Sequence, residues 1–205
     1  MNHIDTIIFD IGGVLIDTNP KYLYRKLFQG DEEKLDWFLN QICTSDWNLE
    51  QDAGKNIHVA TQELIEKYPD HDLMIKAYYE RWEEMVAGTI EESVGLLQSL
   101  QLKNNYKLFA LTNWSAETFP RALEIFDFLQ YFDGIVVSGN ENTRKPFPKI
   151  YQIILDRYKI TPEKSVFIDD RFENISGAEL MGIQGIHFKN PFQLKNDLLK
   201  LGILF

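Results

Sequence analysis

Five short runs in the chain are apolar at almost every position and end at polar residues. A strand without apolar–polar alternation is typically buried on both faces of a sheet, so each run predicts a strand in the core. The runs are Thr6–Phe9, Lys107–Leu111, Gly134–Val137, Ser165–Ile168 and Gly185–Phe188. Segments with helical spacing follow the last four runs, at about 116–130, 147–158, 173–182 and 191–201. This alternation predicts an α/β fold with a doubly wound, Rossmann-like parallel sheet of about five strands and helices on both faces.

Residues 18–88 interrupt this alternation. Apolar residues recur there at helical spacing, and no convincing strand appears. We therefore expect a helical-bundle cap of about four helices at 18–88, inserted after the first strand. The α/β core would comprise residues 1–17 and 89–205, with a helix over about 90–102 that leads to the second strand.

Polar side chains collect where the predicted strands end. The carboxyl ends of parallel strands meet at one edge of the sheet, which is where open α/β sheets bind ligands. Three carboxylates, a hydroxyl and a lysine should converge there. These positions are Asp10, Gly12 and Gly13 after the first run, Thr112, Asn113 and Ser115 after the second, Lys145 before the third helix, and Asp169, Asp170 and Asn174 after the fourth run.

This set of groups suits phosphoryl chemistry. Three close carboxylates repel one another unless a cation lies among them, and an all-oxygen ligand set suits Mg²⁺. A carboxylate can attack phosphorus and form an aspartyl-phosphate. A metal, a lysine, a hydroxyl and backbone N–H groups then neutralise and hold the phosphoryl oxygens.

Charge and composition narrow the partners. The formal net charge of −10 disfavours nucleic acid and anionic membranes, so a phosphate site needs its own local positive charge. Cys43 is the only cysteine, which excludes a disulfide within the chain. No stretch is apolar enough to span a bilayer, and the N-terminal run does not match a signal peptide. We expect a cytoplasmic monomer that acts on a small phosphorylated metabolite.

Four motifs resemble those of the haloacid dehalogenase superfamily, whose members are mostly phosphatases, and they occur in the family's order. They are FDIGGVL (Phe9–Leu15), LTNWS (Leu111–Ser115), RKPFPKIY (Arg144–Tyr151) and FIDDRFEN (Phe167–Asn174). The resemblance covers roughly residues 1–17 and 89–205, and the helical insertion lies where the family places its cap. The chain is similar to the branch with a small helical cap and a paired-acid fourth motif, which includes sugar-phosphate phosphatases.

The resemblance implies roles in phosphoryl transfer. Asp10 would be the covalent nucleophile, and Lys145 would steady both this nucleophile and the phosphoryl oxygens. Thr112 would bind the phosphoryl group, with Asn113 beside it and the Gly12–Gly13 loop contributing backbone contacts.

The same resemblance implies the metal ligands. Mg²⁺ would be held by Asp10, Asp170 and the backbone carbonyl of Gly12. Asp169 would lie close by and act directly or through a water.

One position departs from the family pattern. Most phosphatases of this family carry a second aspartate two residues after the nucleophile, which protonates the leaving group and later activates water. Here that position is Gly12. General acid–base help is typically worth about 10²–10⁴ in rate, so the sequence predicts slow turnover or another group in that role.

Three alternatives remain open. A 2-haloacid dehalogenase would use Asp10 to attack carbon without a metal, although the Asp169–Asp170 pair favours a phosphatase. A phosphosugar mutase is disfavoured because mutases of this family depend on the acid that Gly12 replaces. A phosphate-binding module with weak catalysis is also consistent with Gly12, because fold resemblance does not imply activity.

At single positions, a purely structural role competes with the catalytic or binding role. Asp10 alone could cap a helix, and Thr112 could bond nearby backbone; the joint occurrence of the motifs favours the catalytic interpretation.

Among the aromatic residues, Trp47 and Trp114 have the best chance of touching substrate, although packing is the commoner role. Glu50 and Asp52 could contact a sugar or simply be solvated.

Overall fold

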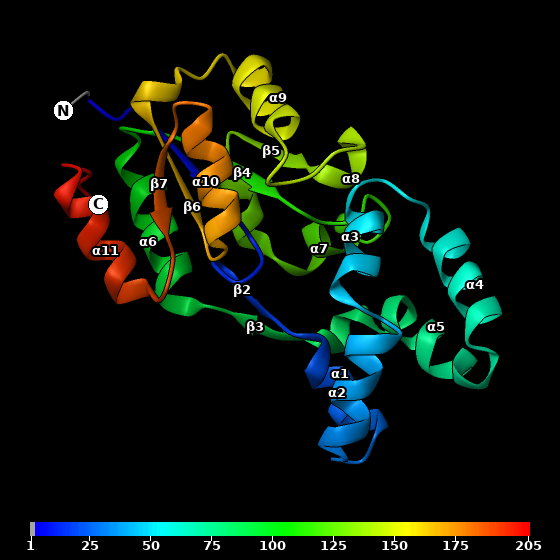
Figure 1. Cartoon of the computed structure of the whole chain (residues 1–205). Coiled ribbons are helices and arrows are strands. Elements are labelled where there is room, and N and C mark those ends of the chain that lie inside the picture. Colours follow the sequence, from blue (N-terminus) through cyan, green and yellow to red (C-terminus); the bar gives the residue numbers. More distant parts are fainter. Residues whose placement is uncertain (1–2) are drawn as a thin grey trace.

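The computed structural model describes residues 3–205, and its centre is a five-stranded parallel sheet (Figure 1). The strands lie in the order β5-β4-β1-β6-β7, and every neighbouring pair is parallel. The five predicted strands are therefore confirmed, with ends shifted by at most one residue. They are β1 (Thr6–Phe9), β4 (Lys107–Thr112), β5 (Gly134–Val137), β6 (Ser165–Asp169) and β7 (Gln184–His187).

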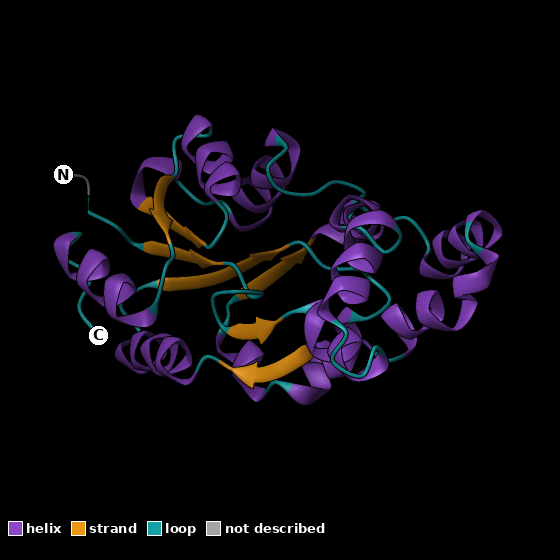
Figure 2. Ribbon diagram, turned by 60° about the horizontal axis from the view of Figure 1, so that its bottom comes forward, coloured by secondary structure: helices purple, strands orange, loops and turns teal. Residues whose placement is uncertain are grey.

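Helices cover both faces of the sheet, as predicted for a doubly wound fold (Figure 2). One face carries α6 (Glu91–Lys103), α7 (Phe119–Ile125) and α11 (Pro191–Lys200), whose apolar residues pack with Ile7 and Phe9. The other carries α9 (Pro148–Tyr158) and α10 (Phe172–Leu180), which pack with Ile8. Successive residues of a strand point to opposite faces, so one run of three residues serves two cores.

Two helical segments differ from the prediction. The segment expected at about 116–130 is split into α7 and a 3₁₀ turn at Asp127–Tyr131. A four-residue helix, α8 (Ser138–Glu141), follows β5 and was not predicted, because one helical turn carries no periodic signal.

The inserted segment folds into five α-helices within the described residues, rather than about four. Most begin at a polar side chain that accepts a backbone N–H, which satisfies donors that the first turn leaves free. Examples are Asn19, Asp31, Thr44 and Asn56. The helices are α1 (Pro20–Leu27), α2 (Glu32–Gln41), α3 (Ser45–Asp52), α4 (Ile57–Lys67) and α5 (Asp72–Glu80), with 3₁₀ turns at Pro69–His71 and Trp82–Met85.

These helices pack around an apolar cluster of their own. Its buried members include Tyr24, Phe38 and Ile75, and it is separate from the two clusters that flank the sheet. The helices lie beyond one end of the sheet, on the opposite side of the core from α11 (Figure 1).

A two-stranded antiparallel ribbon connects the two parts. It consists of β2 (Ile16–Thr18) and β3 (Val86–Thr89). The expectation that 18–88 contains no strand is wrong at its end. β3 escaped notice because it is short, half-buried and contains Gly88, so it shows neither a continuous apolar run nor alternation. The predicted domain limits near 17/18 and 88/89 fall within this ribbon, and residues 1 and 2 of the predicted core lie outside the described part.

Gly177 gives a test of how tightly α10 packs. A Cβ there would lie 2.7 Å from the carbonyl oxygen of Pro146 and 3.0 Å from the Tyr151 ring. Gly177→Ala should therefore lower the free energy of unfolding by about 1–3 kcal/mol, the usual cost of overpacking. Gly95→Ala, in α6 with open space around the new Cβ, should instead raise it by about 0.5–1 kcal/mol through helix propensity. Urea unfolding of both variants measures the two effects, and stabilisation by Gly177→Ala would contradict this packing.

Candidate active site

Three carboxylates converge at the carboxyl edge of the sheet, as the sequence predicts. Asp10 directly follows β1, Asp169 ends β6 and Asp170 comes next. One oxygen from each lies within 4.8 Å of the others. Asp10 and Asp169 are buried, whereas Asp170 is exposed. The strands β1 and β6 are neighbours in the sheet, which is why acids some 160 positions apart in the chain meet.

Lys145 lies at the centre of this cluster. Its Nζ is 2.8 Å from Asp10 Oδ2 and 2.7 Å from Asp169 Oδ2, and its side chain is fully buried. A buried ammonium is tolerated only where opposite charges and hydrogen bonds replace its water. The carboxylates of Asp10 and Asp169 therefore fix the position of the Lys145 amine.

Asn113 fixes the backbone that carries Lys145. Its Oδ1 accepts a hydrogen bond from Lys145 N at 2.8 Å, and its Nδ2 donates to Lys145 O at 3.1 Å. Both ends of the amide are thus occupied by the lysine backbone. The phosphate-binding role expected for Asn113 stays a prediction, and the observed contacts give its side chain a positioning function.

Asp169 accepts several hydrogen bonds besides the one from Lys145. The Arg171 backbone N–H donates to its Oδ1 at 2.8 Å, and Asn174 Nδ2 lies 3.0 Å from both carboxylate oxygens. These donors hold the carboxylate in one orientation. Asn174, whose role the sequence left open, thereby supports the acid beside Asp10.

Two of the three carboxylates, Asp10 and Asp170, have a raised pKa. Burial raises the pKa of Asp10 well above its ordinary value, Lys145 opposes this rise, and Asp169 and Asp170 add to it. Burial and then Asp169 raise the pKa of Asp170. Burial alone would lower the pKa of Lys145, but Asp10 and Asp169 raise it on balance, so the amine stays charged. The single positive charge of Lys145 does not balance the negative charge of three carboxylates, and a bound cation would supply the missing positive charge.

Gly13 creates the room that Asp170 occupies. Its φ is +74°, a region that favours glycine, and a Cβ would lie 2.6 Å from Asp170 Oδ2. At Gly12, by contrast, a Cβ would meet only Thr18 Cγ2 at 3.5 Å, which is ordinary contact. The glycine at position 13 is therefore required sterically, and the one at position 12 is not.

The residues present fit a divalent metal. The three carboxylates offer hard oxygen ligands at mutual distances that one ion can bridge, and they carry more negative charge than Lys145 neutralises. Oxygen ligands of this kind suit Mg²⁺ and Ca²⁺ better than softer metals. Asp10 and Asp170 are the candidates for direct ligands, because Asp169 already accepts hydrogen bonds from three groups, whereas Asp10 accepts from two.

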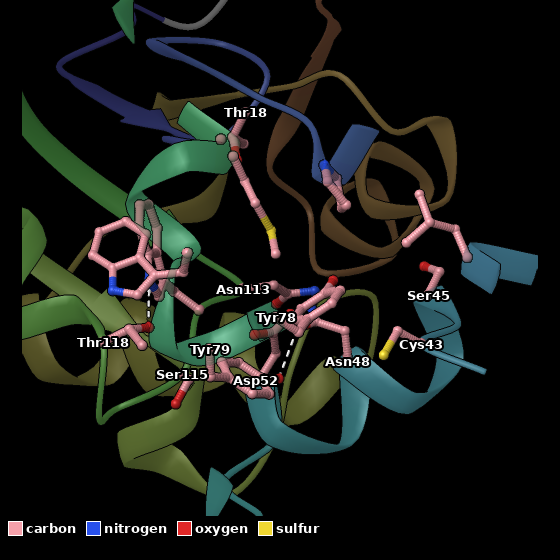
Figure 3. A pocket seen from close by; sticks show the side chains of 16 residues that line it. Thr18, Cys43, Ser45, Asn48, Asp52, Tyr78, Tyr79, Asn113, Ser115 and Thr118 are labelled. Carbon is pink, nitrogen blue, oxygen red and sulfur yellow. Dashed lines mark hydrogen bonds between the residues drawn. The ribbon is translucent and has the colours of Figure 1, made fainter. Parts of the chain in front are cut away.

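A cavity of about 400 Å³ lies between this edge of the sheet and the inserted helices (Figure 3). The core contributes Gly12, Asn113 and Ser115 to its lining. The insertion contributes mainly apolar and aromatic residues, with Thr18, Ser45, Asn48 and Asp52 as polar groups. Thr112 is buried at the end of β4, and no hydrogen bond of its side chain is found among the described residues.

The four candidates for substrate contact separate into two groups. Trp114 and Asp52 line the cavity. Trp47 instead packs on Tyr78, with ring centroids 5.2 Å apart, and Glu50 is exposed and paired with Lys55 at 2.8 Å.

Ser138 is a site residue that sequence reasoning missed. Its Oγ accepts a hydrogen bond from the Trp114 backbone N–H at 3.0 Å and donates to the backbone carbonyl of Asp52. It thus ties the loop after β4 to helix α3. Its place directly after β5, at the same sheet edge as the other site residues, was the available signal.

Comparison with known proteins agrees with this geometry. A family model described as haloacid dehalogenase-like hydrolase matches residues 4–182. A phosphorylated carbohydrates phosphatase of Thermotoga maritima is 24% identical over 90% of this chain and 84% of its own length.

Two solved structures share the fold. The enzyme BT-2542 of Bacteroides thetaiotaomicron, in complex with magnesium and inorganic phosphate, has a TM-score of 0.67 and 23% identity over 91% of this chain and 95% of that one. An L-2-haloacid dehalogenase from Xanthobacter autotrophicus has a TM-score of 0.65 and 16% identity, and the match covers 98% of this chain and 85% of that one.

No helix within residues 3–205 is long and apolar enough to cross a membrane. The family model spans most of the chain, and the four motifs that suggested the family meet at one site. The chain belongs to the haloacid dehalogenase-like hydrolases and is an enzyme of that family.

Proposed function

We propose that this enzyme is a Mg²⁺-dependent phosphatase of a small phosphorylated metabolite, with Asp10 as its covalent nucleophile. The observation that carries the proposal is the buried ammonium of Lys145, held at 2.8 Å from Asp10 and 2.7 Å from Asp169, with Asp170 beside them. A fixed positive charge next to an attacking carboxylate suits a reaction in which negative charge accumulates on phosphoryl oxygens. The named activity of the Thermotoga relative and the magnesium–phosphate complex of BT-2542 support the same assignment.

In this mechanism the carboxylate of Asp10 attacks phosphorus in line with the leaving oxygen. Its Oδ1 accepts the Ile11 backbone N–H at 2.7 Å and its Oδ2 accepts Lys145 Nζ, so the group is oriented before substrate arrives. Bound Mg²⁺ would neutralise phosphoryl oxygens from the Asp10–Asp170 side, with the Gly12 carbonyl as a further ligand. Lys145 and Thr112 would stabilise the remaining phosphoryl oxygens. Water then hydrolyses the aspartyl-phosphate and frees Asp10.

We propose that residues 18–88 act as the cap of this active site. Three features support this proposal. The five helices have their own apolar cluster, the β2–β3 ribbon joins them to the core, and they close the cavity above Gly12 and Asn113. A cavity of about 400 Å³ suits a compact substrate, and its polar lining residues suit hydroxyl groups such as those of a sugar phosphate.

The first prediction concerns the nucleophile and the metal. Phosphate release from a panel of phosphomonoesters, including p-nitrophenyl phosphate and sugar phosphates, should require Mg²⁺ and stop in EDTA. Asp10→Asn should reduce release to the level without enzyme, because an amide does not attack phosphorus. Release that persists in Asp10→Asn would contradict the mechanism. Metal-independent turnover of 2-chloropropionate in place of phosphate release would instead indicate a dehalogenase.

The second prediction concerns Gly13. Gly13→Ala should raise the Mg²⁺ concentration for half-maximal activity by roughly 10- to 100-fold, the usual effect of displacing a group that positions a metal ligand. The new Cβ would push against Asp170. Gly30→Ala is the matched control, because its φ of +84° is similar but nothing lies within 4 Å of the new Cβ. Equal Mg²⁺ requirements in the two variants would contradict this role of Asp170.

A further inference from the structure

We propose that Asp52, on helix α3 of the cap, is the general acid and base of this phosphatase, in the role for which Gly12 has no side chain. The inference rests on the proposed function and adds a residue to it. An alkoxide is a poor leaving group, and hydrolysis of the aspartyl-phosphate needs a proton acceptor for water. A titratable group close to the leaving oxygen would supply both proton transfers.

Asp52 lies in the right compartment for this role. It lines the cavity that Gly12, Asn113 and Ser115 also line, and its residue is only 8% exposed (Figure 3). Ser138 binds its backbone carbonyl and thereby docks the end of α3 onto the core. The other cap acid considered from the sequence, Glu50, points to solvent and is paired with Lys55.

The carboxylate of Asp52 has capacity left for substrate. Its one hydrogen bond among residues 3–205 comes from Asn48 Nδ2, which lies 3.0 Å from Oδ2. No ion-pair partner approaches it within 4 Å in the same part of the chain. A buried carboxyl without a counter-ion favours its neutral form, which can donate a proton.

Burial, opposed by two cations, brings the pKa of Asp52 close to neutral pH. The pKa of Asp52 is raised to about 7, because burial outweighs the lowering effects of Arg144, Lys145 and the Asn48 hydrogen bond. Tyr78 and Tyr79 on α5 face the same region and stay neutral, because burial raises their pKa. A catalytic acid is most effective when its pKa lies near the working pH.

Asp52 gives up one proton in the first step of the reaction and regains one in the second. In the first, the Asp10 carboxylate forms a bond to phosphorus, the bond from phosphorus to the leaving oxygen breaks, and that oxygen takes the proton of Asp52. In the second, water attacks phosphorus, the bond from phosphorus to Asp10 breaks, and the Asp52 carboxylate takes the proton of the water. Phosphate is released, and Asp10 and Asp52 return to their starting forms.

The test compares two aryl phosphates whose leaving groups need different amounts of help. p-Nitrophenolate leaves readily without a proton, whereas phenolate does so less readily. Asp52→Asn should lower kcat/KM for phenyl phosphate by roughly 10²-fold or more and leave kcat/KM for p-nitrophenyl phosphate within about 10-fold. Because the second step also loses its base, the variant should release a burst of p-nitrophenolate equal to the enzyme concentration.

The wild-type kcat/KM for phenyl phosphate should fall above about pH 7, where Asp52 loses its proton, and this decline should be absent in Asp52→Asn.

Two further variants separate this role from a structural one. Glu50→Gln makes the same carboxylate-to-amide change on the same helix and should change neither rate constant. Adding Gly12→Asp to Asp52→Asn should restore much of the rate on phenyl phosphate, since a Cβ at position 12 would meet only Thr18 Cγ2, at 3.5 Å.

Equal losses on both substrates without a burst would overturn the role of Asp52 and indicate substrate binding or folding instead, as would no loss at all. A wild-type enzyme that hydrolyses neither ester would overturn the proposed function itself, an outcome distinct from a defect confined to Asp52→Asn.

Discussion

The site depends on one buried positive charge. Lys145 Nζ is removed from water between Asp10 and Asp169, and each of the three groups is tolerable there only because the others are present. Removing one member of such a buried cluster typically costs about 3–5 kcal/mol, because it leaves an uncompensated charge. Asn113 holds the lysine backbone and Asn174 holds Asp169, so these hydrogen bonds fix the geometry of the charges. Asp10, the proposed nucleophile, is therefore oriented by the same interactions that make burial of the lysine possible.

The inserted helices, which we propose to be a cap, meet the core around a cavity to which both contribute polar groups. Ser138 links them with one hydroxyl, which bonds to the Trp114 backbone on the core and the Asp52 carbonyl on the cap. The β2–β3 ribbon is the covalent connection, and it is short and half-buried. Under our proposals, the sheet edge would hold the phosphoryl group, and the cap would face the rest of the substrate. Under our proposals, the cap also supplies the proton that the core lacks at Gly12.

Much of the fold was accessible from the sequence because its strands are buried on both faces. Such strands are continuous apolar runs, and the polar residues that follow them mark the ligand-binding edge. What escaped prediction has no local signature. β3 is half-exposed and α8 is one turn long, so neither shows a period. The hydrogen bonds from Asn113 to the backbone of Lys145 span 32 positions of the chain. The role proposed for Asp52 depends on its burial, which arises only when the inserted helices pack against the core.

The central claim, that Asp10 becomes covalently phosphorylated, is tested most directly by mass spectrometry of enzyme quenched in acid during turnover of p-nitrophenyl phosphate with Mg²⁺. The account predicts one phosphoryl group on the peptide that contains Asp10, and its absence from Asp10→Asn treated in the same way. Rapid turnover with no phosphoryl group on that peptide, or with the group on another residue, would contradict the account.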